Sequence, residues 1–108
     1  MYVTLRFHHG GKLQQKLSIK YHGGTVTDCF NMDVDRLSYF EFIDIVKKIG
    51  YNFSSYIVYL RPPKRKKLVI VTCDRDILGI LPLLRNGDVI ELYLTYLVDV
   101  ADVVPFIE

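Results

Sequence analysis

Apolar side chains recur through residues 38–51 with the spacing of one helix face. Phe42, Ile45, Val46 and Ile49 follow the pattern i, i+3, i+4, i+7. An amphipathic helix must bury such a face against other elements. Because most of the remaining chain has the pattern of strands, we expect this helix to be the element on which a sheet packs.

The ends of this stretch carry helix-terminating residues. Ser38 is suited to cap the N-terminus, and Glu41 three residues later completes the spacing of a capping box. Lys47 and Lys48 lie in the last turn, where the helix dipole favours cations. Gly50 is placed to end the helix in a left-handed conformation. The sequence therefore predicts one main helix that begins after Ser38 and ends at Gly50.

Alternation of apolar and polar residues predicts the strands. Residues 2–7 alternate from Val3 to Phe7, as in a strand with one buried face. Gly10-Gly11 follows, a dipeptide that accepts the positive φ angles of a hairpin turn. Residues 13–21 keep the period of a second strand. We therefore expect the chain to open with a hairpin between these two strands.

The rest of the chain divides into shorter elements. Gly79 and Pro82 limit any helix within residues 74–84 to about two turns, with Asp74 or Asp76 as its cap. The other expected elements are a short strand at 25–30, a loop at 31–35, strands at 56–60 and 68–72, a turn at 85–88 and a last strand at 89–98.

This order indicates an α+β domain with a mixed sheet of four to five strands, one main helix and a short second helix. A helix that crosses a sheet whose first and last strands pair in parallel is a β-grasp arrangement. A ferredoxin-like fold would need a helix between the first two strands, which the expected hairpin at Gly10-Gly11 excludes. We expect one domain over residues 1–98, followed by a tail or an extra strand at 99–108.

Charge is concentrated in one loop. The chain has a formal net charge of +2, and half of its residues are hydrophobic, which argues against disorder. Three interpretations of the loop remain open: a nuclear-localisation signal, a contact for nucleic-acid phosphates, or a solvated hairpin loop. The loop follows Pro62-Pro63, and its cations are Arg61, Lys64, Arg65, Lys66 and Lys67.

The cysteines and histidines do not have metal-site spacing. Cys29 and Cys73 are expected as free thiols in a reducing compartment, with a disulfide as the alternative. His8 and His9 are adjacent and should point to opposite faces of a strand, so they cannot easily share an ion with His22. There is no C-x-x-C or H-x-x-x-H pattern. We expect no metal and no other cofactor.

The sequence also argues against catalysis and against a membrane span. Asp74 and Asp76 could be paired carboxylates for acid–base chemistry, but helix capping or an interaction role explains them more simply. There is no nucleophile with a partnered histidine and no Gly-rich phosphate loop. The longest apolar stretch, residues 77–84, is broken by Gly79 and Pro82 and is too short to cross a bilayer.

Six segments in order resemble one family. They are similar to motifs of the plant PB1-like domain, which is found at the N-terminus of many Mutator-type (MuDR-like) transposase proteins and their domesticated relatives. The resemblance covers roughly residues 2–97. The matching segments are VTLRFHHGGK at 3–12, YHGGTV at 21–26, DVDRLS at 33–38, DIVKKIGY at 44–51, TCDRDI at 72–77 and DVIELY at 88–93.

The resemblance implies a ubiquitin-like β-grasp fold and a non-enzymatic role in protein–protein interaction. Related PB1 domains pair front to back, with basic residues on the first two strands of one domain against an acidic cluster on another. In this chain the loop that normally carries the acids is basic, and only Asp74 and Asp76 match the acidic element. We therefore expect this chain to supply the basic side, with Arg6, Lys12, Lys16 and Lys20 as candidates.

The expected partner is another protein, either a PB1-type or an acidic-faced domain. A second copy of the chain is an alternative, because a basic face and the residual acids could pair head to tail. A nucleic-acid-binding accessory domain that uses residues 61–67 is the second functional hypothesis. The resemblance implies a transposase-derived protein in the nucleus, with the cytoplasm as a second location.

Overall fold

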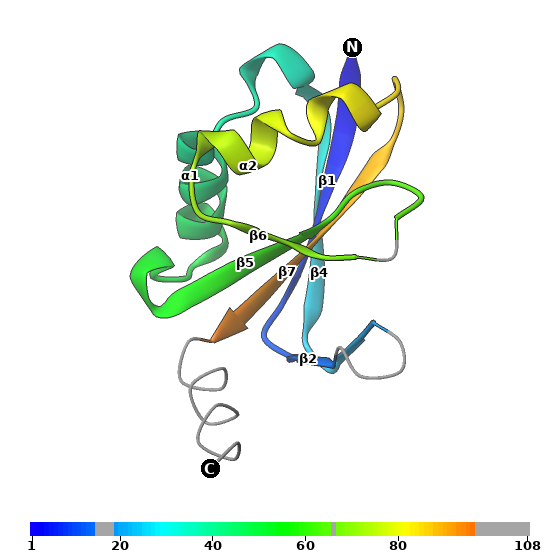
Figure 1. Ribbon diagram of the computed structural model, residues 1–108. Coiled ribbons are helices and arrows are strands. Elements are labelled where there is room, and N and C mark those ends of the chain that lie inside the picture. The colour runs from blue at the N-terminus through cyan, green and yellow to red at the C-terminus, as the bar shows by residue number, and fades with distance from the viewer. Residues whose placement is uncertain (15–18, 66, 97–108) are drawn as a thin grey trace.

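The computed structural model describes residues 1–14, 19–65 and 67–96, and these form a mixed five-stranded sheet with two helices. The strand order is β4-β1-β7-β5-β6, and a separate two-stranded sheet pairs β2 with β3 (Figure 1). The strands are β1 (Tyr2–His9), β2 (Lys12–Gln14), β3 (Lys20–His22), β4 (Thr25–Asp33), β5 (Tyr56–Arg61), β6 (Val69–Val71) and β7 (Val89–Tyr96). The helices are α1 (Tyr39–Ile49) and α2 (Asp74–Leu78), with 3-10 turns η1 (Val34–Arg36), η2 (Phe53–Ser55) and η3 (Leu81–Leu83).

The first and last strands of the sheet lie side by side and run parallel. Their register extends from Thr4 opposite Val89 to His8 opposite Tyr93. This pairing confirms the predicted β-grasp arrangement. The turn before β7 also holds the start of β1, because the Gly87 N–H donates to the Tyr2 carbonyl oxygen at 2.8 Å.

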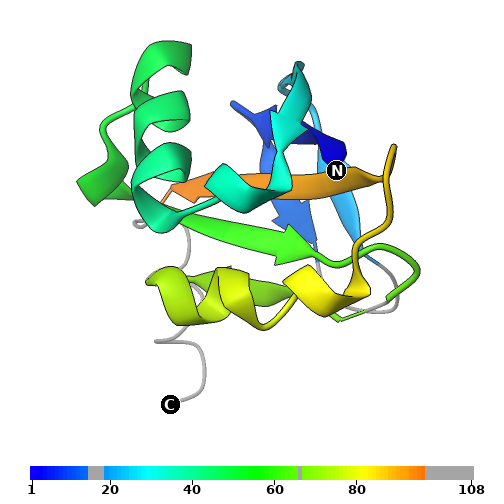
Figure 2. The same ribbon diagram turned by 90° about the horizontal axis from the view of Figure 1, so that it is seen from above.

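Helix α1 has the predicted ends and packs across one face of the sheet (Figure 2). The Ser38 hydroxyl accepts the Glu41 N–H at 3.2 Å, and Gly50 ends the helix with a φ of 115°. Phe42 is fully buried and meets the ring of Phe7 edge-on, with 6.4 Å between the ring centroids. Helix α2 lies beside β6 and closes the other end of the core.

The core lies between this face of the sheet and the two helices. Alternation along β1 and β7 provides its centre, as the sequence predicted for both strands. The side chains with the lowest exposure in these strands are Val3, Leu5, Phe7, Ile90, Leu92 and Leu94. Tyr93 and Thr95, on the opposite face of β7, are buried as well. Strand β7 is therefore covered on both sides.

The predicted opening hairpin at Gly10-Gly11 is wrong. Strand β1 pairs antiparallel with β4, while β2 and β3 form a small hairpin that leaves the sheet and returns to it. The chain segment that leaves the sheet after β1 and the segment that returns to it before β4 cross where Gly11 and Gly24 are in close contact. A Cβ on Gly24 would lie 2.7 Å from the Gly11 nitrogen and still closer to the His9 carbonyl oxygen. The two Gly-Gly pairs therefore form a backbone crossing, and at Gly11 and Gly24 there is no room for a side chain.

Two further boundaries differ from the prediction. The strand expected at 25–30 continues to Asp33, so most of the expected loop is strand. Asn31 adopts a φ of 55° where the β1–β4 register shifts, and this irregularity bends the strand without ending it. Asp33 then accepts the Asp35 N–H and caps η1. The expected last strand is described as far as Tyr96, and the tail at 99–108 lies outside the described residues.

The short second helix is present, and Asp76 caps its N-terminus from within the first turn, as the third residue of a capping box. Its N-cap is Cys73. Asp76, one turn into the helix, accepts the N–H groups of Thr72 at 2.8 Å and Cys73 at 3.3 Å. Asp74 accepts the Tyr39 N–H at 2.8 Å and thus caps helix α1 instead. Asp74 thus links the starts of the two helices, while Asp76 closes the start of α2.

Candidate protein-interaction surface

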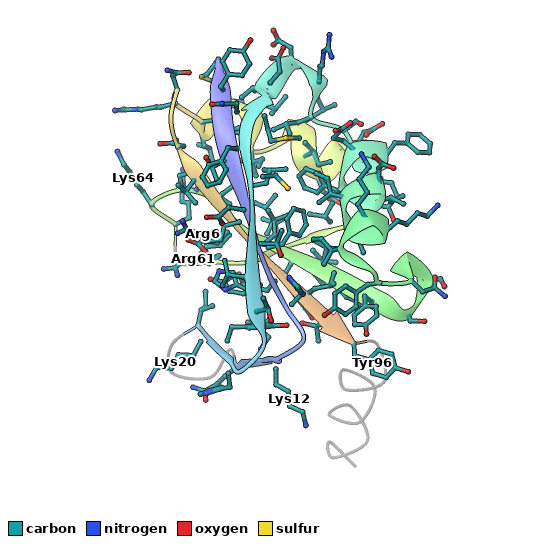
Figure 3. The ribbon with its side chains drawn as sticks, turned by 180° about the vertical axis from the view of Figure 1, so that it is seen from behind. Arg6, Lys12, Lys20, Arg61, Lys64 and Tyr96 are labelled. Atoms are coloured by element: carbon teal, nitrogen blue, oxygen red, sulfur yellow. The ribbon has the colours of Figure 1, made fainter. Side chains whose placement is uncertain are left out.

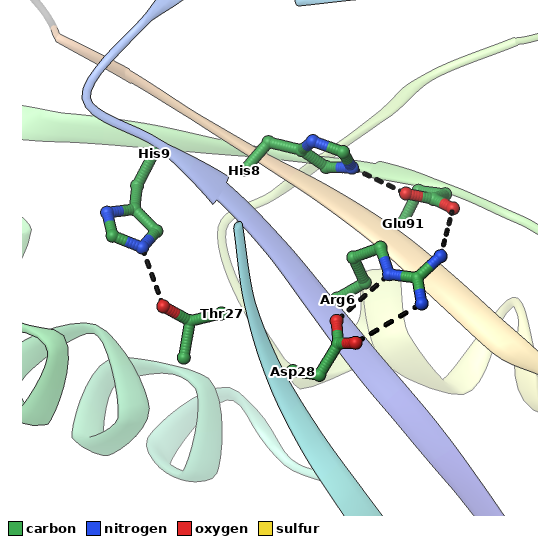
Figure 4. Close-up of polar contacts among 6 residues, drawn as sticks. All are labelled: Arg6, His8, His9, Thr27, Asp28 and Glu91. Carbon is green, nitrogen blue, oxygen red and sulfur yellow. Dashed lines mark hydrogen bonds and ion pairs between the residues drawn. The ribbon is translucent and has the colours of Figure 1, made fainter. Parts of the chain in front are cut away.

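Four charged or titratable side chains form a continuous chain of contacts on the face of the sheet away from α1 (Figure 4). Alternation along β1 places Arg6 and His8 on this face, opposite Asp28 in β4 and Glu91 in β7. Arg6 binds Asp28 through two hydrogen bonds, Nε to Oδ1 at 2.9 Å and Nη2 to Oδ2 at 3.2 Å. Glu91 lies 3.8 Å from Arg6 Nη1 and 2.5 Å from His8 Nε2.

This chain of contacts, which we call the Arg6 network, sets the charge of the predicted basic face. The hydrogen bond and the charge of Asp28 raise the pKa of Arg6, and the same hydrogen bond lowers the pKa of Asp28. The Arg6 side chain is still 37% exposed. Arg6 is therefore accessible to a partner, but its charge is already balanced within the domain.

Aromatic contacts attach the β2–β3 hairpin to the Arg6 network. The His8 ring stacks on Tyr93 with 4.7 Å between centroids, and Tyr21 from β3 lies 5.8 Å from Tyr93. The Tyr21 hydroxyl donates to the Leu94 carbonyl oxygen at 2.8 Å. The hairpin thus covers Tyr93, which explains the burial of both faces of β7.

The hairpin presents the other predicted basic residues. Lys12 and Lys20 are both exposed, and within residues 1–14, 19–65 and 67–96 neither forms an ion pair. Figure 3 shows them at one end of the molecule, below Arg6 and Arg61. The fourth predicted residue, Lys16, lies outside the described residues. The structure therefore divides the predicted face into a balanced part at Arg6 and an unbalanced part on the hairpin.

The predicted acidic residues lie far from this face in the fold. Asp74 and Asp76 are at the start of α2, where both accept backbone N–H groups. These hydrogen bonds lower the pKa of Asp76, with those from the backbone N–H and hydroxyl of Thr72 as the main causes. Both carboxylates are thus engaged within the domain, although Asp74 is exposed.

The basic loop connects β5 to β6 and is partly ordered by its own hydrogen bonds. The Arg65 N–H donates to the Pro62 carbonyl oxygen at 3.1 Å, and Arg61 Nε donates to the Arg65 carbonyl oxygen at 3.0 Å. Lys64 lies at the turn with a φ of 61°. Lys64, Arg65 and Lys67 are exposed, and Lys66 is not described.

The histidines have three separate environments. His8 faces the Arg6 network, whereas His9 points into the core and contacts Thr27 Oγ1 at 2.8 Å and the Tyr51 hydroxyl at 3.0 Å. Burial, with a contribution from His8, lowers the pKa of His9. His22 contacts Gln14 on the small hairpin. In the part of the chain that the structure describes, no group of three His, Cys, Asp or Glu side chains could hold a metal ion.

Both cysteines are free thiols. Cys29 is half-buried in β4, and burial raises its pKa, while Cys73 is exposed. The structure thus gives no disulfide between the two cysteines. None of the described helices is long and apolar enough to span a membrane.

The sequence analysis missed Asp28, Glu91 and Tyr21 as parts of the candidate surface. The alternation of residues 89–98 was enough to predict the face of the strand on which Glu91 lies. Its contact with Arg6 depends on the parallel register of two strands at opposite ends of the chain. Asp28 became a neighbour of Arg6 only because β4, not the segment after Gly10-Gly11, is the partner of β1.

The strand order, the crossing helix and the charged sheet face define a ubiquitin-like β-grasp domain of the protein-interaction type. The family model of the PB1-like domain matches residues 1–96, and the chain belongs to that family. A comparison with curated proteins gave no match. PB1-like domains are non-catalytic modules that bind other proteins, which makes this chain a protein-interaction module.

Proposed function

We propose that this module binds an acidic surface of another protein through the β2–β3 hairpin and the adjoining Arg6 network. The observation that carries this proposal is the pair of exposed ammonium groups on Lys12 and Lys20, which have no ion-pair partner among the described residues. An opposing acidic surface would supply that partner. Complementary charge of this kind governs partner choice and association rate more than affinity.

Arg6 has a different role in this proposal. Its guanidinium contacts Asp28 and Glu91 but is still partly exposed, so a partner carboxylate can join or replace one of them. Lys16, predicted on the same face, would add a further cation. The chain thus supplies the basic side of a PB1-type pairing. Asp74 and Asp76 would supply only a weak acidic side for self-pairing, because both accept hydrogen bonds within the domain.

A comparison of two double variants tests this surface. The full chain is used as bait, captured proteins are identified by mass spectrometry, and binding of each purified partner is then measured by calorimetry. Lys12→Gln/Lys20→Gln should weaken binding, whereas Arg36→Gln/Lys47→Gln removes two exposed cations from η1 and α1 and should not. Equal binding by both variants would refute the role of the hairpin.

A nucleic-acid-binding function is the second candidate, because a hollow of about 390 Å³ beside the basic loop is lined by Arg61, Lys64 and Arg65. Glu91 also lines this hollow and opposes a phosphate there. Binding should appear in a shift assay at low salt, weaken steeply as salt rises and disappear in Lys64→Gln/Arg65→Gln/Lys67→Gln. The absence of a shift at low salt would eliminate this candidate.

We also propose that the module belongs to a transposase-related protein and acts in the nucleus, with the cytoplasm as a second location. Support for the location comes from the exposed cations of the basic loop, which follow Pro62-Pro63. A fluorescent fusion of the full chain should accumulate in nuclei, and the triple loop variant should not. Equal distribution of both proteins would remove the loop as a nuclear signal.

A further inference from the structure

An open groove runs between the basic loop, β6 and the α2–η3 segment, on a different side from the Arg6 network. Its volume is about 790 Å³. Figure 1 shows α2 beside β6, with η3 continuing from the end of α2. Apolar side chains of Val69, Ile80 and Leu83 line the groove together with three cationic residues, Arg65, Lys67 and Arg75. The groove thus combines an apolar surface with positive charge.

The positive charge of the groove is not balanced within the described part of the chain. None of Arg65, Lys67 and Arg75 forms an ion pair with a residue of the ranges 1–14, 19–65 and 67–96. The acid in the groove is Asp76, whose Oδ2 accepts hydrogen bonds from Thr72 and Cys73, so one carboxylate lies among three cationic residues and the groove stays net positive. A ligand of this groove should therefore be both apolar and acidic.

The chain itself contains a segment of this composition. Residues 97–108 read LVDVADVVPFIE. The segment has acids at Asp99, Asp102 and Glu108, no basic residue, and apolar side chains at all of its remaining positions. We propose that residues 97–108 of a second copy of this chain bind in the groove. The acids would contact Arg65, Lys67 and Arg75, and the intervening side chains would cover the exposed parts of Val69 and Leu83.

The geometry favours a second copy over the same copy. Tyr96 pairs with Tyr56 at the start of β5, whereas the groove lies beside Pro62 at the far end of that strand. The length of β5 is about 20 Å, which a chain covers with about six extended residues. Within one copy, the residues from 97 to about 102 would be needed to cross that distance, so Asp99 and Asp102 could not reach the groove. From a second copy, all three acids can reach the groove.

Such a contact joins two different surfaces, so it can continue from copy to copy and form chains. Sedimentation of the full chain at increasing concentration should therefore show growing assemblies. The groove variant Arg65→Gln/Lys67→Gln/Arg75→Gln and the tail variant Asp99→Asn/Asp102→Asn/Glu108→Gln should each associate roughly tenfold more weakly, because each exposed ion pair contributes a factor of about two. Mixed together at a concentration where neither variant associates alone, the two variants should form mainly a one-to-one dimer, since only one unweakened pairing remains.

A matched control separates this inference from the proposed function. Lys12→Gln/Lys20→Gln/Lys47→Gln removes the same number of charges outside the groove and should associate like the unaltered chain. Loss of association in this control, but not in the groove variant, would assign self-association to the hairpin face and overturn the inference. An unaltered chain that stays monomeric at every concentration would also overturn it. In that case, amide shifts at Ile80 and Leu83 between the unaltered chain and the tail variant would identify binding within one copy.

Discussion

The crossing of the two Gly-Gly pairs gives the sharpest prediction on stability. Gly23 and Gly24 both have positive φ angles, 73° and 79°, so alanine at either position adopts an unfavourable backbone conformation. That conformation costs about 1–2 kcal/mol for a residue with a Cβ. Around Gly23 a Cβ meets nothing within 4 Å, whereas at Gly24 it meets only backbone atoms, which cannot rotate away.

Gly23→Ala and Gly24→Ala therefore differ only in the steric clash between the new Cβ of residue 24 and the neighbouring backbone. Overpacking against a well-packed structure costs about 1–3 kcal/mol, and backbone neighbours place Gly24→Ala at the upper end of that range. The gain from a less flexible unfolded chain is the same in both variants and cancels. We expect Gly24→Ala to lower the free energy of unfolding by about 2 kcal/mol or more beyond Gly23→Ala. The melting temperature should then differ by at least about 8 °C.

Urea unfolding followed by circular dichroism measures both free energies. The unaltered chain and Gly23→Ala should share one unfolding slope, which shows that the same fold is compared. A difference below about 0.5 kcal/mol between the two variants would refute the crossing, because only the contacts of Gly24 distinguish it from its neighbour.

Four further variants test the core and the charged groups. Phe42→Ala should lower the free energy of unfolding by about 3–5 kcal/mol, because Phe42 is fully buried, while Phe40→Ala, at a side chain that is 77% exposed, should change it by less than about 0.5 kcal/mol. Because the pKa of His9 is lowered in the folded chain, the unfolded chain binds a proton at this imidazole at a higher pH. The free energy of unfolding should therefore fall as the pH drops through about 6.5. In urea titrations, His9→Gln should reduce this fall between about pH 7 and 5. The lowered pKa of Asp28 has the same sign in a more acidic range: its contribution is complete above about pH 4 and is lost as the pH falls through its lowered pKa, so Asp28→Asn should lose less stability in that range. A pH profile unchanged by either charge variant would contradict the corresponding assignment.

The sequence predicted the elements whose signals are local. Helix α1 carries its cap at Ser38, its apolar face and its terminating Gly50 within one short stretch, so its bounds follow from neighbouring residues. The parallel pairing of the first and last strands was also predictable, because the element order leaves few arrangements. The hairpin was wrong for a physical reason: Gly10-Gly11 has the composition of a tight turn, yet its conformation serves a crossing with Gly23-Gly24.

The candidate surface was only partly predictable for the same reason. Arg6 alternates with the buried residues of its strand, so the sequence placed it on the face of the sheet opposite the core. Its ion pairs depend on the registers that bring Asp28 and Glu91 beside it from other strands. A count of basic residues therefore overestimated the free charge of this face, and Lys12 and Lys20 emerged as the unbalanced cations only when the whole sheet was in place.

The central position of β7 has a consequence for synthesis of the protein. This strand lies between β1 and β5 and is the last described strand to be translated. Until residues 89–96 have left the ribosome, the strands of the five-stranded sheet can form only two separate antiparallel pairs, β1 with β4 and β5 with β6. Each pair then exposes the apolar side chains that Ile90, Leu92 and Leu94 later cover. Apolar surface of the nascent domain therefore stays exposed until β7 is inserted between the two pairs, and exposed surface of this kind favours aggregation.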